Sequence, residues 1–155
     1  MNRVTPDFAD FLMKEALVEA ELGARKGEVP VGAVLAIDGV VVSRAHNLTE
    51  TDRFVGAHAE LLAIQRAGVS GSSWRLDSAV LCVTLEPCTM CFGAIRLARI
   101  PTVIFGAGDS KQGAMGSLYD LSLDPRLGAP MKVIRNLKAN ECGELLKKFF
   151  EARRG

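Results

Sequence analysis

Two short motifs carry the side chains in this sequence that are best suited to chemistry. Residues 87–91 read PCTMC and contain two cysteines, Cys88 and Cys91. Residues 58–60 read HAE and place an imidazole, His58, two positions before a carboxylate, Glu60. By spacing alone, the cysteine pair could be a redox centre, part of a structural zinc site or part of a catalytic zinc site. The side chains that the fold brings beside the cysteines must decide among these.

The two motifs occupy equivalent places in the expected order of strands and helices. His58 opens a helix that follows the second strand, and Cys88 opens a helix that follows the third strand. Junctions from strand to helix meet at one edge of a sheet, where ligands usually bind. A helix N-terminus also favours thiolate over thiol. We therefore expect one imidazole and two thiolates to meet at this edge.

One histidine and two cysteines form a ligand set that suits zinc. Three protein ligands leave a fourth position for water, as in catalytic sites, and zinc lowers the pKa of that water towards about 7. Glu60 is then near enough to touch the water without binding the metal, and its carboxylate can pass a proton to a leaving group. A redox pair would leave the HAE motif unexplained.

A non-catalytic zinc domain that binds RNA is the alternative from another class of protein. Such a site needs a fourth protein ligand, for which His46, Cys82 and Cys142 are the candidates. We expect Cys82, in the middle of a strand, and Cys142, in the last helix, to be small buried apolar residues instead.

The same motifs resemble those of a known enzyme family. HAE and PCTMC together match the H-x-E…P-C-x-x-C signature of the zinc-dependent nucleobase deaminases. The chain further resembles the bacterial tRNA-specific adenosine deaminases along nearly its whole length. The resemblance is carried by VPVGAVL (29–35), His46-Asn47, AHAE (57–60), VTLEPCTMC (83–91), FGAGDSKQGAMGS (105–117) and ECGELLKKFF (141–150).

The resemblance implies a fold, a reaction and partners. The implied fold is a cytidine-deaminase-like three-layer α-β-α sandwich, with a mixed five-stranded sheet and helices on both faces, in a single domain over residues 1–155. The implied reaction is hydrolytic deamination of adenosine to inosine at the wobble position of a tRNA anticodon, in which water activated by zinc attacks the adenine ring and Glu60 shuttles protons. It also implies one zinc ion per subunit, a tRNA anticodon stem-loop as partner, and a homodimer.

The resemblance also assigns substrate-binding residues. Asn47 is expected to hold the target nucleoside by hydrogen bonds, and Asp109 and Lys111 to contact the neighbouring nucleotides. Phe150 and Arg153 are expected to supply stacking and a phosphate contact, as looped RNA is usually held. Phe149, beside them, is expected to lie in the core. The remaining substrate-binding residues are expected around the base pocket and the metal ligands: Pro30, Val31, Ala57, Leu85, Glu86 and Pro87.

The loop before HAE departs from the family pattern. Members commonly have a Trp before the Asn that matches Asn47 and an Asn-Arg-Pro tripeptide there, whereas this chain has His46-Asn47-Leu48-Thr49. Members also commonly have Asp-Pro-Thr where residues 54–56 read FVG. These changes leave the zinc chemistry intact. They keep open a second hypothesis, in which the protein is a deaminase of a free base or nucleoside such as guanine, cytosine or cytidine.

Local patterns predict the elements that position these residues. Thr5 and Pro6 start a helix that ends at Gly23 or Gly27, and Asp38-Gly39 is a hairpin turn between two strands. We expect residues 48–54 and 108–117 to be loops, and a short helical stretch to follow the second loop. The predicted strands are 29–37, 40–47, 79–85, 102–107 and 131–136, and the other predicted helices are 57–68, 88–99 and 140–154.

The bulk properties of the chain exclude some classes of protein. The formal net charge is +1, so overall charge points to no partner, although residues 131–155 carry seven basic and three acidic side chains. The N-terminus lacks the apolar segment of an export signal, and no apolar run reaches the roughly 20 residues that span a bilayer. We therefore expect a cytoplasmic protein.

Overall fold

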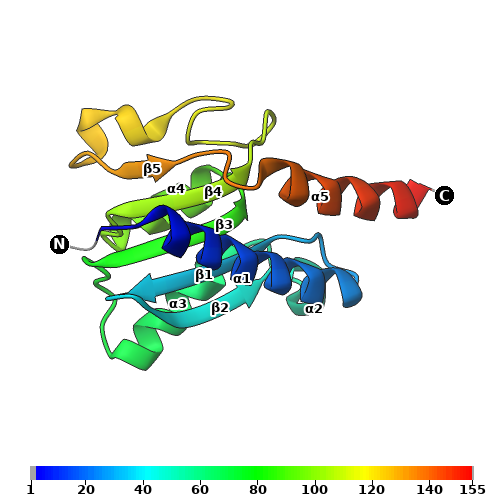
Figure 1. Cartoon of the computed structure of the whole chain (residues 1–155), viewed down its shortest axis with the longest axis horizontal. Coiled ribbons are helices and arrows are strands. Elements are labelled where there is room, and N and C mark those ends of the chain that lie inside the picture. Colours follow the sequence, from blue (N-terminus) through cyan, green and yellow to red (C-terminus); the bar gives the residue numbers. More distant parts are fainter. Residues whose placement is uncertain (1–2, 155) are drawn as a thin grey trace.

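Five strands form one mixed sheet in the order β2-β1-β3-β4-β5 (Figure 1). The structure is a computed structural model that describes residues 3–154. β1 runs antiparallel to β2 and β3, whereas β3, β4 and β5 run parallel to one another. The strands are β1 (Gly32–Ile37), β2 (Val40–His46), β3 (Ala79–Leu85), β4 (Thr102–Ala107) and β5 (Lys132–Ile134).

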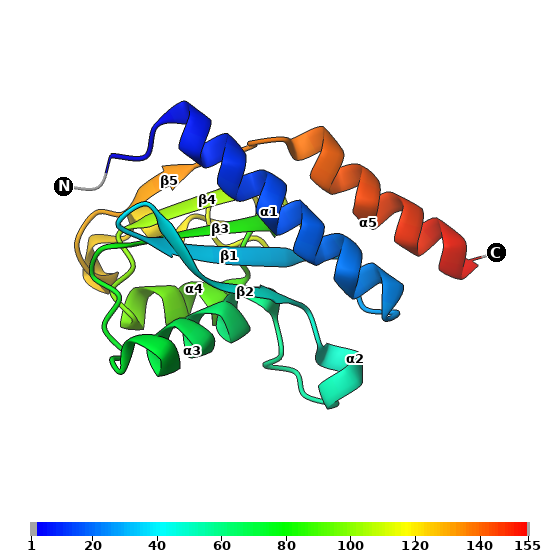
Figure 2. The same cartoon turned by 60° about the horizontal axis from the view of Figure 1, so that its bottom comes forward.

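Helices cover both faces of the sheet (Figure 2). On one face lie α1 (Pro6–Arg25) and α5 (Ala139–Arg154), and on the other lie α3 (Ala59–Gly71) and α4 (Thr89–Leu97). A single-turn helix, α2 (Thr49–Asp52), stands beside the sheet between β2 and α3. The expected mixed α/β sandwich is therefore confirmed.

The central strands β1 and β3 are almost entirely apolar because both of their faces are buried. In β1, Ala33 and Leu35 belong to the core beneath α3 and α4, whereas Val34 and Ala36 belong to the core beneath α1 and α5. β3 alternates in the same way. The two cores share the sheet and fix which ends of the strands lie together.

Local signals at the start of the chain act as expected. Thr5 caps α1, since its hydroxyl accepts a hydrogen bond of 3.1 Å from the Phe8 amide, and Pro6 is the first helical residue. The hairpin turn uses Asp38 and Gly39, whose φ angles are 51° and 78°. α1 ends at Arg25, two residues before Gly27.

Several predicted boundaries are wrong. β1 begins at Gly32 rather than at 29, and α3 runs through Gly68 and ends at Gly71, where Ser72 adopts a left-handed conformation. The predicted loop 48–54 contains α2, which no sequence pattern indicated. The prediction that Phe149 lies in the core is also wrong. Phe149 is half-buried and lies outside the two buried cores, and the guanidinium carbon of Arg153 lies 4.4 Å from its ring centroid.

No helix in the described part of the chain combines the length and the apolar character needed to cross a membrane.

Candidate metal centre and substrate pocket

The two motifs meet at one edge of the sheet, as the topology requires. Residues Gly32 and His46 pair at the start of β1 and the end of β2, and the next residue of β1, Ala33, pairs with Val83 near the end of β3. His58 is the residue that caps the N-terminus of α3, and Cys88 is the corresponding residue of α4. Neither side chain forms a capping hydrogen bond to its own helix, so the imidazole and the thiol can face each other instead.

The three candidate ligands are spaced as zinc requires. His58 Nδ1 lies 3.7 Å from Cys88 Sγ and 3.4 Å from Cys91 Sγ, and the ligand atoms all lie within 4.8 Å of one another. Tetrahedral zinc with ordinary bond lengths separates nitrogen and sulfur ligands by about 3.5 Å. One borderline-soft cation therefore fits among these atoms without a change of backbone.

The candidates for a fourth protein ligand lie elsewhere. Cys82 and Cys142 are buried in the core beneath α1 and α5, where their sulfur atoms lie 3.9 and 3.8 Å from Met13 Sδ. The His46 Nδ1 atom lies 3.0 Å from Glu19 Oε1. The geometry therefore favours three protein ligands, the number found in catalytic zinc sites, over the four of a structural site.

The cluster also holds negative charge suited to a cation. A hydrogen bond from the Cys91 thiol, aided by His58, lowers the pKa of Cys88 to about 4. The same bond between the two sulfur atoms, together with burial, raises the pKa of Cys91. The pKa of His58 is raised, chiefly by its hydrogen bond to Cys88. The cluster thus stabilises one thiolate, and a cation would replace the protons that the groups share.

Glu60 stands beside this cluster in the first turn of α3. Its side chain is only 4% exposed, and this burial raises its pKa to about 7. A carboxyl group with such a pKa exchanges a proton readily at neutral pH, which is the property of a general acid and base.

A pocket of about 540 Å³ opens over the cluster, a volume typical of small-molecule sites. Eight of the residues predicted from the sequence line it: Val31, Asn47, His58, Glu60, Leu85, Glu86, Cys88 and Asp109. The sequence did not indicate a further eight: Glu28, Val29, Thr49, Glu50, Val55, Thr89, Met90 and Gln112. Four of these, Val29, Thr89, Met90 and Gln112, directly adjoin a predicted residue in the sequence, and that proximity was the available signal; the other four adjoin none.

Three of the predicted substrate-binding residues next to the pocket do not line it. Pro30, Ala57 and Pro87 are buried. The carbonyls of Ala57 and Pro87 accept hydrogen bonds from Leu48 and Ala114, so they hold the two loops that flank the metal centre. Their structural role explains why they stand in the motifs without facing the cavity.

Of the predicted RNA contacts, Asp109 lines the pocket, whereas Lys111, Phe150 and Arg153 lie away from its lining. Lys111 is exposed in the loop after β4, and Phe150 is 42% exposed on α5. The Arg153 side chain donates a hydrogen bond to the Gly27 carbonyl, besides its contact with Phe149. This arrangement ties the end of α5 to the turn after α1.

Asn47 connects the pocket to α3, the helix that starts next to His58. Its Oδ1 atom accepts a hydrogen bond of 2.8 Å from the Ala59 amide at the start of α3. The side-chain oxygen therefore fixes the helix that carries His58 and Glu60. The nitrogen of the same side-chain amide is a hydrogen-bond donor.

Comparisons with known proteins agree with this site. The profile of the MafB19-like deaminase family matches residues 9–154. A protein of Bacillus subtilis (strain 168) named tRNA-specific adenosine deaminase is 47% identical over 141 residues, which are 91% of this chain and 88% of that relative. The chain belongs to this deaminase family. It is therefore an enzyme, and the resemblance of its motifs to those of the tRNA-specific adenosine deaminases is confirmed.

A solved structure supports the same conclusion, and a more distant one shows the shared fold. One structure, from studies of A-to-I editing by tRNA:A34 deaminases, matches with a TM-score of 0.84 at 42% identity and covers 88% of this chain and 99% of that chain. A guanine deaminase from Nitrosomonas europaea matches with a TM-score of 0.71 at 21% identity over 96% of this chain and 86% of that chain, which shows that this deaminase shares the fold.

Proposed function

We propose that this deaminase converts adenosine to inosine at the wobble position of a tRNA anticodon by zinc-dependent hydrolysis. The observation that carries the proposal is the 47% identity, over 91% of the chain, to a relative named for action on tRNA. The buried Glu60 beside the cluster of His58, Cys88 and Cys91 supports the chemistry. An enzyme that acts on tRNA works where tRNA is used, so the proposal includes a cytoplasmic location.

The donor set of His58, Cys88 and Cys91 would hold one zinc ion per chain. Zinc, when bound, supplies Lewis-acid activation of the attacking water. Glu60 takes the proton that this water gives up and delivers it to the adenine ring nitrogen next to the carbon under attack. It then transfers the second proton of the water to the exocyclic amino group, which leaves as ammonia, and inosine remains. The pKa of about 7 suits both directions of transfer.

The other pocket residues orient the base. The amide nitrogen of Asn47 donates a hydrogen bond to the nucleoside, while its oxygen holds α3 in place. Val31 and Leu85 supply apolar walls for the ring. An anticodon loop already splays its bases, so turning the target into the pocket costs less than from a duplex. Asp109, on the pocket rim, contacts the neighbouring nucleotide, and the basic C-terminal segment attracts the backbone phosphates.

We also propose that the enzyme is a homodimer. An apolar groove between α3 and α4 supports this proposal, and its lining includes Val69, Trp74 and Leu97, which are 76%, 63% and 77% exposed. Apolar side chains gathered on one surface usually mark an interface. A second copy of the chain would cover them.

The test is a deamination assay with zinc-loaded protein. One arm contains a tRNA transcript with adenosine at the wobble position, and the other contains free adenosine, cytidine, guanine and cytosine. The products are digested and identified by mass spectrometry. We expect inosine in the tRNA arm alone. Turnover restricted to a free base or nucleoside would keep the zinc chemistry but show that the substrate is a free base or nucleoside rather than tRNA.

A further inference from the structure

The loop after β4 is held by two oppositely charged side chains from distant parts of the chain. The loop spans residues 108–117, forms one rim of the pocket through Asp109 and Gln112, and is followed by a segment that leads to β5. Glu86 approaches it from the end of β3, and Arg135 approaches it from the residue after β5. Neither residue is close in sequence to the loop.

Glu86 binds the loop through its backbone donors. Its carboxylate accepts hydrogen bonds from the amides of Asp109 (3.1 Å), Met115 (2.9 Å) and Ser117 (3.1 Å), and another from the Ser117 hydroxyl. The residue is only 2% exposed. A buried carboxylate with this many donors is a strong local anchor, because hydrogen bonds to a charged group are stronger than neutral ones.

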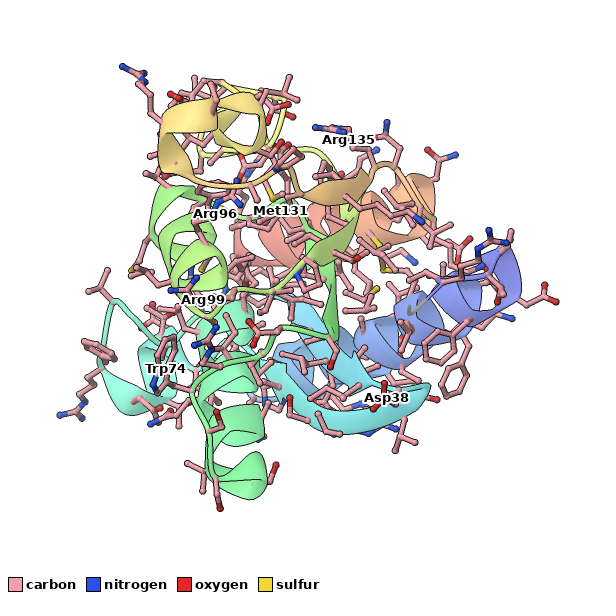
Figure 3. The ribbon with its side chains drawn as sticks, turned by 90° about the vertical axis from the view of Figure 1, so that its left-hand side faces the viewer. Asp38, Trp74, Arg96, Arg99, Met131 and Arg135 are labelled. Carbon is pink, nitrogen blue, oxygen red and sulfur yellow. The ribbon has the colours of Figure 1, made fainter. Side chains whose placement is uncertain are left out.

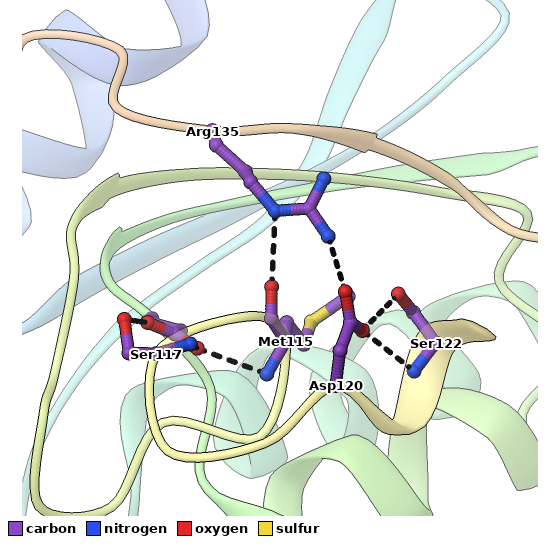
Figure 4. Close-up of polar contacts among 6 residues, drawn as sticks. Met115, Ser117, Asp120, Ser122 and Arg135 are labelled. Atoms are coloured by element: carbon purple, nitrogen blue, oxygen red, sulfur yellow. Dashed lines mark hydrogen bonds and ion pairs between the residues drawn. The ribbon is translucent and has the colours of Figure 1, made fainter. Parts of the chain in front are cut away.

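Arg135 binds the other side of the same loop (Figure 4). Its Nε atom donates to the Met115 carbonyl at 3.0 Å, and its Nη2 atom pairs with Asp120 Oδ2 at 2.9 Å. Asp120 in turn accepts a hydrogen bond from the Ser122 amide at 3.0 Å. Met115 is therefore held at both ends of its backbone, with its amide bound by Glu86 and its carbonyl bound by Arg135.

The glycines of the loop give these two side chains room. A Cβ atom on Gly113 would lie 2.5 Å from Glu86 Oε2 and 2.6 Å from the Asp109 carbonyl oxygen. A Cβ atom on Gly116, whose φ is 136°, would lie 3.2 Å from Arg135 Nε. The glycine-rich sequence GDSKQGAMGS thus belongs to a loop packed closely around two charged groups.

The 108–117 loop touches both the N-terminus of α4, beside Cys88, and the pocket. Gly113 forms a β-bridge with Cys88, and the Ala114 amide donates to the Pro87 carbonyl at 2.9 Å. The segment that follows the loop is fastened to α4 as well, since Arg96 Nη1 donates to the Ala129 carbonyl at 2.6 Å. Figure 3 shows Arg96 beside this segment, near Met131, with Arg135 further along the chain.

We propose that Glu86 and Arg135 are positioning residues that hold the 108–117 loop so that Asp109 can grip the nucleotide beside the target base. This role rests on the proposed action on RNA. Glu86, expected from the sequence to touch the substrate, acts through the loop. Arg135 acts from the opposite side of the loop. It stands 20 residues after Met115, and no motif contains it.

Arg135→Met is the sharper test, because Arg135 lies far in sequence from the metal ligands and methionine keeps much of its apolar stem. Arg126→Met is the matched control, since Arg126 also pairs with an aspartate, Asp124, in the following segment but holds no part of the loop. Arg135→Lys, which keeps the charge but cannot make both contacts in the same geometry, is expected to give an intermediate result.

The first measurement is amide hydrogen exchange without RNA. In Arg135→Met, we expect exchange across residues 113–117 to become about tenfold faster, because the anchoring bonds to a charged group are lost. Exchange in α1 and in the strands, and the zinc content, are expected to stay unchanged. Loop exchange equal to that of Arg126→Met would overturn the proposal.

The second measurement separates positioning from general destabilisation. For an anticodon stem-loop, we expect Arg135→Met to raise KM about tenfold while kcat stays within about threefold, as happens when ground-state binding alone is lost. Faster loop exchange with an unchanged KM would overturn the link to the nucleotide. A wild-type protein that does not deaminate RNA would refute the proposed function and the nucleotide contact together, and the exchange data would still decide whether Arg135 holds the loop.

Discussion

Three carboxylates are buried around the pocket, and their partners distinguish their roles. Glu28 and Glu86 are 1% and 2% exposed, and each accepts hydrogen bonds from backbone amides, Glu28 from α2 and Glu86 from the 108–117 loop. Glu60, 4% exposed, has its pKa raised to about 7 by burial, whereas the pKa of Glu28 is lowered. Carboxyl groups whose environments push their pKa values apart perform different tasks. Glu60 is therefore suited to carry protons, whereas Glu28 is suited to remain charged and hold backbone.

Glu60→Gln tests the proton transfer. Glutamine has nearly the same shape but cannot accept and return a proton, so we expect kcat to fall by about 10²–10⁴ or more, the usual contribution of general acid–base catalysis. The zinc content, measured by inductively coupled plasma mass spectrometry, is expected to remain at one ion per chain.

Glu50→Gln is the matched control, because Glu50 lines the same pocket but is exposed. We expect this variant to keep most of its activity. Substantial turnover by Glu60→Gln, or an equal loss in both variants, would remove the shuttle role from Glu60.

At the scale of elements, the short helix α2 is stabilised by hydrogen bonds to the carboxylate of Glu28. The carboxylate of Glu28 accepts hydrogen bonds from the amides of Glu50 (3.1 Å) and Thr51 (2.7 Å) and from the Thr51 hydroxyl at the start of α2. A helix of four residues cannot satisfy its own first amides. The pocket wall formed by Thr49 and Glu50 therefore depends on a side chain that precedes β1.

Glu28→Gln should change how stability depends on pH. Burial alone would raise the pKa of Glu28, but the hydrogen bonds from Thr51 and Glu50 outweigh it, and the pKa lies below its ordinary 4.5. A carboxyl group whose pKa is lowered by folding contributes stability above its unfolded pKa and loses this contribution as the pH falls through its folded pKa. We expect Glu28→Gln to lower the free energy of unfolding at pH 7 by about 1.5–3 kcal/mol, and by less at pH 3.

Urea denaturation at the two pH values measures this difference, with Glu21→Gln as the control on the exposed side of α1. If Glu28→Gln lowered the free energy of unfolding by the same amount at pH 3 and pH 7, the negative charge of Glu28 would not be what holds α2.

The elements also show which features a sequence can predict. The cluster of His58, Cys88 and Cys91 was predictable because zinc chemistry favours these residue types at these spacings, and strand-to-helix junctions bring them together. α2 and the loop anchors were not, because they depend on contacts between residues far apart in sequence. The pairs Glu28 with Thr51 and Arg135 with Met115 are separated by 23 and 20 residues. A buried carboxylate in a loop looks like any other acidic residue until its partners are known.

At the scale of the whole molecule, the two helical layers have different surfaces. The layer of α1 and α5 includes the basic last turn of α5, with Arg153 and Arg154. A hydrogen bond from Arg153 to the Gly27 carbonyl ties this turn to the end of α1. The layer of α3 and α4 exposes an apolar groove. The last turn of α5, which carries Arg153 and Arg154, suits an RNA backbone, and the apolar groove suits a second protein chain.

The proposed dimer can be tested by placing charge in the groove. Leu97 is 77% exposed on α4, so Leu97→Glu should leave the fold intact while setting a desolvated carboxylate into the interface on each side. We expect the wild type to sediment as a dimer and Leu97→Glu to shift the dissociation constant by at least about a hundredfold, since an unpaired buried charge costs about 3 kcal/mol or more. Val18→Glu is the matched control, because Val18 is 53% exposed on α1 in the opposite layer. A dimer that persists in Leu97→Glu but dissociates in Val18→Glu would move the interface to the other face of the sheet, and a monomeric wild type would refute the dimer altogether.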